Sequence, residues 1–153
     1  MIVYRLAKEH FRNDLSGKGA EIAGGRWNNK GIALLYTATN RSLCMAEVLV
    51  HQPLGKLPKD FWLLSIDVPD DCPLQTLASD KLPDNWNTLP HSPESRIIGD
   101  RFVSEGKFIG LLLPSAVVQG DQNLLLNPGH SDFPRVKIVE IEPFVFDPRF
   151  FGR

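Results

Sequence analysis

The sequence of 153 residues has few cysteines, little net charge and no long apolar run. Its two cysteines, Cys44 and Cys72, are too few for a disulfide framework or a cysteine-rich zinc site. The formal net charge of −1 gives no basic field that would draw the chain to nucleic acid or to a membrane surface. No apolar run approaches the length that crosses a bilayer, and residues 1–5 lack the apolar core of a secretion signal. These absences predict a cytoplasmic protein that binds neither nucleic acid nor membrane directly.

The length and the spacing of apolar residues predict a single α+β domain over residues 1–153. Proline, aspartate and asparagine are frequent in residues 72–91, which predicts a long irregular segment. A helix is expected at residues 92–106, because a Ser-Pro start and a glycine stop enclose it. Strands are expected at apolar runs bounded by turn residues, namely residues 3–6, 32–37, 61–68, 108–113, 123–126 and 136–141.

Another helix is expected at about residues 42–51, capped by Thr39 or Asn40, and it is apolar on nearly every side. Such a composition is typical of a buried helix, so the carboxylate of Glu47 must be paired, hydrogen-bonded, protonated or directed into a cleft. His51 follows Glu47 by one turn and lies on the same helix face. Glu47 is therefore a candidate functional residue with His51 beside it.

Two adjacent glycines precede an arginine, a tryptophan and an asparagine in the GGRWN segment (residues 24–28). Glycines let the backbone approach another group closely. The Arg26 guanidinium recognises forked anions such as carboxylate and phosphate. Trp27 offers a flat face, and Asn28 offers an amide donor and acceptor. This combination predicts a site for an anionic ligand that contains a ring.

The spacing of these residues alone leaves other interpretations open. Arg26 and Glu47 can form a buried structural ion pair, and His51 can be a supporting hydrogen-bonded histidine rather than a base. Glu47 and His51 are also spaced to bind a metal, but no third ligand is apparent, so no metal site is predicted. A dinucleotide-binding glycine fingerprint is excluded, because Ile22 stands where the third glycine is needed.

Several motifs along nearly the whole chain resemble, in their order, those of the RES domain family. That family is named for an arginine, a glutamate and a serine, which Arg26, Glu47 and Ser115 match. The matching positions in chain order are Tyr4-Arg5, Ser16-Gly17, Gly19-Ala20, the GGRWN segment, Tyr36, Ala46-Glu47, His51, residues 112–117 (LLPSAV) and residues 123–130 (NLLLNPGH).

The resemblance implies the fold of ADP-ribosyltransferase toxins, with a mixed, mostly antiparallel sheet and a few helices. It also implies the toxin of a type II toxin–antitoxin pair, which consumes NAD⁺ as a glycohydrolase or ADP-ribosyltransferase. NAD⁺ is then the substrate, and no further cofactor is implied. The usual partner in this family is an Xre-like helix-turn-helix antitoxin that covers the active site. The aromatic tail at residues 144–151 is also compatible with a homodimer.

The resemblance assigns roles to individual residues. Glu47 is expected to stabilise positive charge on the ribose, Arg26 to hold phosphate or ribose, and Tyr36 to stack on or orient the nicotinamide ring. These three form the predicted catalytic set. The predicted substrate-binding residues are Gly25, Arg26, Trp27, Asn28, Tyr36, His51, Ser115 and Asn127.

Two other functions compete with this prediction. A non-catalytic module that binds a nucleotide or ADP-ribose would use Arg26 and the aromatic residues, but it would not need a carboxylate at Glu47. A ribonuclease toxin is disfavoured by the nearly neutral charge and by the lack of an interleaved basic and aromatic stripe.

Overall fold

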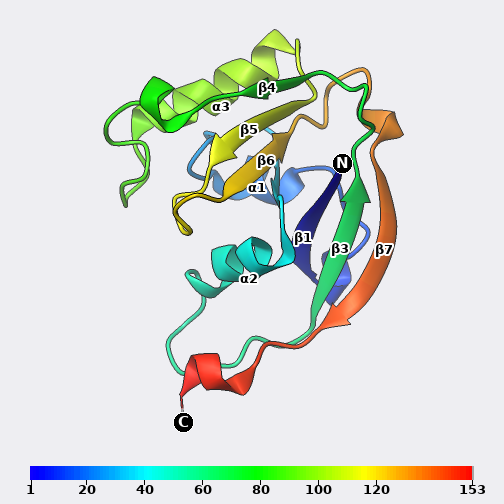
Figure 1. Cartoon of the computed structure of the whole chain (residues 1–153), viewed down its shortest axis with the longest axis vertical. Coiled ribbons are helices and arrows are strands. Elements are labelled where there is room, and N and C mark those ends of the chain that lie inside the picture. Colours follow the sequence, from blue (N-terminus) through cyan, green and yellow to red (C-terminus); the bar gives the residue numbers. More distant parts are fainter. Residues whose placement is uncertain (153) are drawn as a thin grey trace.

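The computed structural model describes residues 1–152, which form one seven-stranded sheet with three α-helices (Figure 1). Within these residues, no helix is both long and apolar enough to cross a membrane. The strands are β1 (Ile2–Lys8), β2 (Leu35–Ala38), β3 (Phe61–Asp67), β4 (Leu74–Thr76), β5 (Gly110–Pro114), β6 (Gln122–Leu126) and β7 (Lys137–Phe144). The helices are α1 (Lys18–Ala23), α2 (Arg41–Leu49) and α3 (Pro93–Glu105), with short 3-10 turns between elements.

The strand order across the sheet is β4-β5-β6-β2-β1-β3-β7. Every pairing is antiparallel except that of β4 with β5. The predicted single α+β domain with a mixed, mostly antiparallel sheet is therefore confirmed. Strand β4 was not predicted, because its three residues lie within the segment 72–91 that composition marks as irregular.

The starts of α2 and α3 and the end of α3 lie at residues that capping chemistry predicts, whereas α2 ends at Leu49, before the predicted residue 51. The Asn40 side chain accepts the Leu43 N–H at 2.7 Å at the start of α2. Ser92 Oγ accepts the Ser95 N–H at 3.1 Å at the start of α3. Helix α3 ends at Gly106, whose φ of 61° is left-handed and suits glycine.

The prediction that α2 is buried on all sides is wrong. Leu43 and Cys44 are buried and pack on the sheet with Leu6, whereas Val50 at the end of the helix is 57% exposed. The helix therefore packs through one face only, and Glu47 is half-buried.

Strand β2 is shorter than the run predicted at residues 32–37. The carbonyl of Ile32 accepts a hydrogen bond from the Asn28 side chain at 3.1 Å instead of joining the sheet. The first half of the predicted strand therefore belongs to the loop that carries the GGRWN segment.

Apolar clusters on both faces of the sheet hold the helices and the C-terminal tail. Leu124 and Leu126 of β6 contribute to one cluster, and Leu125 contributes to the cluster that contains Phe102 of α3. In the tail, Phe146 is 1% exposed and meets the ring of Phe61 edge-on at 5.5 Å. The aromatic tail therefore packs back on the body of the molecule.

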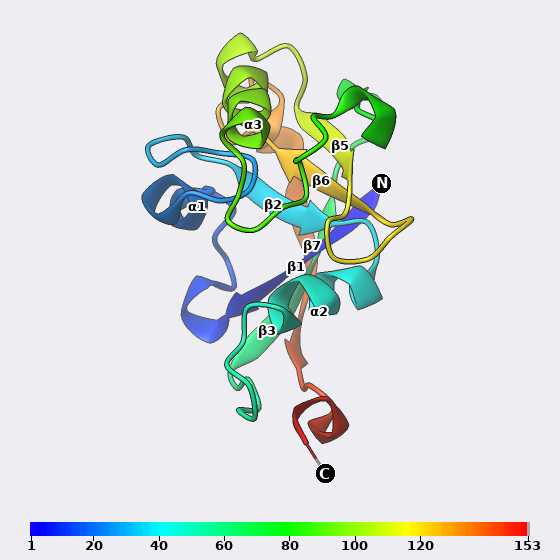
Figure 2. The ribbon, with the colours of Figure 1, turned by 90° about the vertical axis from the view of Figure 1, so that its left-hand side faces the viewer.

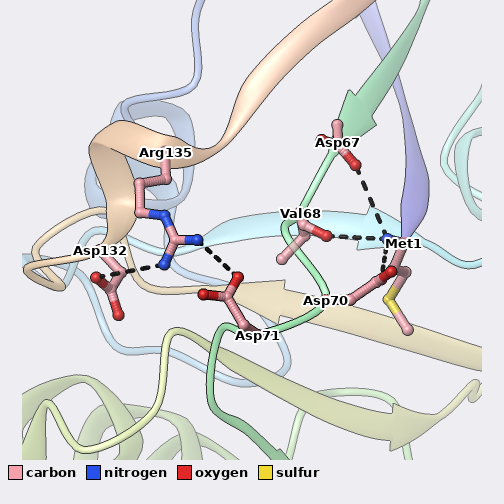
Figure 3. A network of polar contacts seen from close by, with 7 residues as sticks. All are labelled: Met1, Asp67, Val68, Asp70, Asp71, Asp132 and Arg135. Atoms are coloured by element: carbon pink, nitrogen blue, oxygen red, sulfur yellow. Dashed lines mark hydrogen bonds and ion pairs between the residues drawn. The ribbon is translucent and has the colours of Figure 1, made fainter.

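Polar contacts tie the start of β1 and the turn before β7 to the connection between β3 and β4 (Figure 3). The Met1 ammonium donates to the Val68 carbonyl at 2.9 Å and to Asp70 Oδ1 at 2.7 Å. Arg135 Nη2 donates to Asp71 Oδ1 at 2.6 Å. Exposed ion pairs such as these contribute little individually, so their main effect is to fix the local chain path.

Strands β1 and β2 pair at one position only, where Tyr4 lies opposite Ala38. Figure 2 shows the two strands meeting near this point and diverging away from it. On its other side β1 pairs with β3 along its whole length, and β2 pairs with β6 along its whole length. The sheet is therefore continuous on either side but opens between β1 and β2.

Candidate active site

A cavity of about 960 Å³ lies where β1 and β2 diverge. Its walls come from β1, β2, β6, α2, the GGRWN segment and the strap (residues 83–91) that leads into α3. A volume of this size is typical of small-molecule sites. The charged or titratable side chains in its wall include Arg5, Arg26, Glu47, His51 and His91. The cavity thus brings Arg26 and Glu47 together.

Glu47 lines the cavity from α2, and Ser115 holds its carboxylate. Ser115 Oγ donates to Glu47 Oε1 at 2.9 Å. The same Oγ accepts the backbone N–H groups of Val117 and Val118, each at 3.0 Å, which leaves its proton directed at the carboxylate. Ser115 is 6% exposed and does not line the cavity. Ser115 therefore lies behind Glu47 and orients it.

Arg26 shares the cavity with Glu47, but the two side chains do not form an ion pair. Burial lowers the pKa of Arg26, and the nearby Glu47 carboxylate opposes that effect. Arg26 Nη1 instead donates to the backbone carbonyls of Trp86 at 3.0 Å and Thr88 at 2.9 Å. The interpretation of Arg26 and Glu47 as a structural ion pair is thus wrong, because neither side chain is the other's partner.

The Tyr36 hydroxyl joins β2 to the GGRWN segment. It donates to Asn28 Oδ1 at 2.7 Å and accepts the Trp27 N–H at 3.0 Å. Burial raises the pKa of Tyr36 far above its usual value, so the phenol stays protonated. A Cβ on Gly25 would lie 2.7 Å from this hydroxyl, which explains the glycine. Because the hydroxyl is engaged, the ring is the part of Tyr36 that a ligand can contact.

Trp27 and His51, two of the predicted binding residues, also line the cavity. Trp27 stacks on Trp86 of the strap, with ring centroids 6.0 Å apart and planes at 23°. Cys44 lines the cavity too, but burial raises the pKa of its thiol to about 12, so it is no nucleophile at neutral pH. Among residues 1–152, no group of three or more His, Cys, Asp or Glu side chains is placed to hold a metal ion.

Besides Ser115, two further residues predicted to bind substrate, Asn28 and Asn127, do not line the cavity. Asn28 is fully buried, and its amide lies within 3.1 Å of three backbone carbonyls, so it supports the GGRWN segment from behind. Asn127 is 2% exposed, donates to the Val103 carbonyl at 3.3 Å and accepts the Gly129 N–H at 2.9 Å. The structure therefore gives Asn127 a role in the turn after β6 and does not bring it to Glu47.

Two of the five charged or titratable cavity residues named above, Arg5 and His91, received no role from the sequence. Arg5 belongs to a matching motif, and its Nη1 donates to the Asp14 carbonyl at 2.9 Å. Burial lowers the pKa of Arg5, and Asp14 opposes that effect. His91 lies in the strap, and burial followed by the charges of Arg26 and Arg96 lowers its pKa. The position of Arg5 within an apolar strand was a sequence signal that could have marked it as a candidate site residue. His91 had no such signal, because it lies in a segment predicted only as irregular.

Comparison with known proteins agrees with the motif pattern. The family model described as "RES domain" matches residues 2–147. The chain is 36% identical over 149 residues to a "Prs ADP-ribosylating toxin" from Sphingobium sp. (strain YBL2), covering 96% of this chain and 92% of that protein. It is 40% identical over 151 residues to a "Toxin Res" from Photorhabdus laumondii subsp. laumondii, covering 97% of this chain and 96% of that protein.

A solved structure shares the fold. The chain superposes on the crystal structure of the M. tuberculosis MbcT–MbcA toxin–antitoxin complex with a TM-score of 0.72. The alignment has 20% identity and covers 98% of this chain and 86% of that chain, which shows a common fold. Because the family model and the relatives extend over nearly its whole length, this chain belongs to the RES domain family.

Proposed function

We propose that this chain is the toxin of a toxin–antitoxin pair and an enzyme that cleaves the nicotinamide–ribose bond of NAD⁺. Relatives that span nearly the whole chain are named as toxins, one of them as ADP-ribosylating. The observation that carries the proposal is the state of Glu47. Its carboxylate accepts a hydrogen bond from Ser115 at 2.9 Å, pairs with no cation of residues 1–152, and shares a cavity with Arg26.

Breaking this bond develops positive charge on the ribose as nicotinamide leaves. Glu47 stabilises that charge, because a carboxylate fixed in advance acts where the charge appears. Ser115 holds the carboxylate, and Arg26 binds the phosphate-bearing part of NAD⁺ through forked hydrogen bonds. The Tyr36 ring packs on the nicotinamide, and His51 offers a hydrogen bond to the ribose. NAD⁺ is a substrate here, and water, phosphate or a protein side chain can receive the ADP-ribose.

A non-catalytic module that binds ADP-ribose is the competing function, and the variant Glu47→Gln separates the two. The amide keeps the size of the side chain and can still accept from Ser115, but it removes the negative charge. We expect the rate of nicotinamide release, measured by chromatography, to fall roughly 10²–10³-fold. The affinity for ADP-ribose should stay close to that of the original protein. The control is Glu105→Gln, which alters an exposed ion pair with Arg101 and should leave the rate unchanged. Equal rates in both variants would exclude Glu47 from catalysis.

An antitoxin that covers the cavity is the partner expected for such a toxin, and an Xre-like helix-turn-helix protein is the expected type. The structural relative was solved in a toxin–antitoxin complex. Val50 and Leu89 line the cavity while 57% and 74% exposed, so an apolar partner can cover the mouth. A purified complex should release nicotinamide more slowly than the free chain, and an equal rate would contradict a covered cavity.

A further inference from the structure

We propose that the strap sets the direction of the Arg26 guanidinium, and that Trp86 and Ser95 are positioning residues for the reaction. This inference rests on the proposed function, because it takes Arg26 as a group that binds the substrate. It concerns a segment for which the sequence predicted only an irregular path.

The first observation is that the strap, rather than a carboxylate, holds Arg26. Nη1 donates to the carbonyls of Trp86 and Thr88 at 3.0 and 2.9 Å, which uses both N–H groups of that nitrogen. Among residues 1–152 the guanidinium makes no other hydrogen bond or ion pair, so the N–H groups on Nη2 and Nε remain for a ligand. Neutral carbonyls orient the cation without cancelling its charge, which is what an anion-binding arginine requires.

The second observation is that the strap is itself fixed at Trp86. Its indole stacks on Trp27, with ring centroids 6.0 Å apart. Its carbonyl also accepts a hydrogen bond from Ser95 Oγ at 3.2 Å. Ser95 is fully buried in the first turn of α3, so it provides a rigid anchor. The same carbonyl contacts both Ser95 and Arg26, and a chain of contacts therefore runs from α3 through the strap to Arg26.

The third observation is that the strap also forms a wall of the cavity. Asn87, Leu89 and His91 line it, and the strap contains neither helix nor strand. A segment with few regular backbone hydrogen bonds depends for its position on contacts such as those of Trp86. A shift of the strap therefore turns Arg26 and changes the cavity wall together.

Two substitutions loosen the strap without touching Arg26. Trp86→Ala removes the stacking face, and Ser95→Ala removes the hydroxyl behind the shared carbonyl. Because misplacing a binding group by about 1 Å can cost 10²-fold in rate, we expect each variant to slow nicotinamide release roughly 10- to 100-fold. Trp86→Phe keeps a flat ring and should restore most of the rate. Ser104→Ala, on the exposed side of α3 and away from the strap, is the control and should behave as the original protein.

A double-mutant cycle with Arg26→Ala tests whether the strap acts through the guanidinium. The readout is ADP-ribose binding by calorimetry, because it does not require turnover. We expect Trp86→Ala to weaken binding when Arg26 is present and to have no further effect when residue 26 is alanine. The inference is overturned if Trp86→Ala weakens ADP-ribose binding equally with arginine or alanine at residue 26. It is also overturned if Trp86→Ala does not weaken binding when Arg26 is present. If thermal unfolding shows that Trp86→Ala does not fold, Ser95→Ala serves in the same cycle.

The cycle also separates this inference from the proposed function. If the original protein neither releases nicotinamide nor binds ADP-ribose, the proposed function fails. If the original protein does both but the cycle shows no coupling between residues 26 and 86, only the positioning role of the strap fails.

Discussion

Buried hydroxyl groups fix Glu47 and the GGRWN segment, which line the cavity. Ser115 donates to Glu47, and Tyr36 bridges Trp27 and Asn28. The Ser115 hydroxyl has no spare bond for a ligand and the Tyr36 hydroxyl has no spare proton to donate, so each contributes by fixing the position of another group. Their removal should therefore change the rate or the stability while most of the contact surface for the substrate is retained.

Substitution of Ser115 by alanine tests this at the carboxylate. The variant leaves Glu47 without its orienting donor, and a hydrogen bond to a charged group contributes about 1.5–3 kcal/mol. We expect kcat for nicotinamide release to fall roughly 10- to 100-fold with KM for NAD⁺ little changed. Ser131→Ala in an exposed loop is the matched control. A raised KM with unchanged kcat would instead show that Ser115 contributes to substrate binding.

The pH dependence of the unfolding free energy should contain a contribution from His91. Its Nδ1 is buried without a hydrogen-bond partner, and burial, then Arg26, Arg96 and His51, lower its pKa from 6.5. The unfolded chain therefore takes up this proton at a higher pH than the folded chain. Stability that is present above about pH 6.5 is lost as the pH falls through the folded-state pKa.

We expect the unfolding free energy, measured with urea at about pH 7.5 and pH 5.5, to fall less in His91→Asn than in the original protein. His10→Asn, at an exposed histidine, should keep the original pH dependence. If His91→Asn and His10→Asn respond alike, His91 does not contribute to this loss.

At the scale of secondary-structure elements, the backbone of α3 lies against that of the GGRWN segment at Gly99. A Cβ there would lie 1.6 Å from the carbonyl oxygen of Trp27, so the helix or the segment would have to move. Gly99→Ala should lower the unfolding free energy by about 1–3 kcal/mol or more, although alanine favours helix. Gly19→Ala in α1 meets nothing within 4 Å and should be neutral or slightly stabilising. Similar urea midpoints for both variants would contradict this packing.

The helix elements also show where sequence reasoning succeeds and where it stops. Caps are local chemistry, so Ser92 and Gly106 could be placed from the sequence, and the cap of α2 could be narrowed to Thr39 or Asn40, of which Asn40 is the cap. The burial of α2 could not be predicted in this way, because Val48 lines the cavity as well as packing against a core cluster, and Val50, just after the helix, lines the cavity while 57% exposed. An apolar side chain looks the same in the sequence whether it contacts a neighbour or a cavity.

At the scale of the whole molecule, the motif pattern predicted that Arg26 and Glu47 act together, and one cavity contains both. It could not show that Asn127 lies away from that cavity, because the order of motifs does not tell which end of a strand reaches a site. It also gave no role to Arg5, His91 or the strap. Their place in the site depends on the opening between β1 and β2, which is a property of strand pairing.

The most direct test of a catalytic Glu47 is to incubate the purified chain, free of any antitoxin, with NAD⁺ and to identify every product by mass. We expect the loss of NAD⁺ to be matched by free nicotinamide and by ADP-ribose, either free or attached to phosphate or protein. A folded chain that leaves the NAD⁺ intact would contradict the proposed cleavage of the nicotinamide–ribose bond.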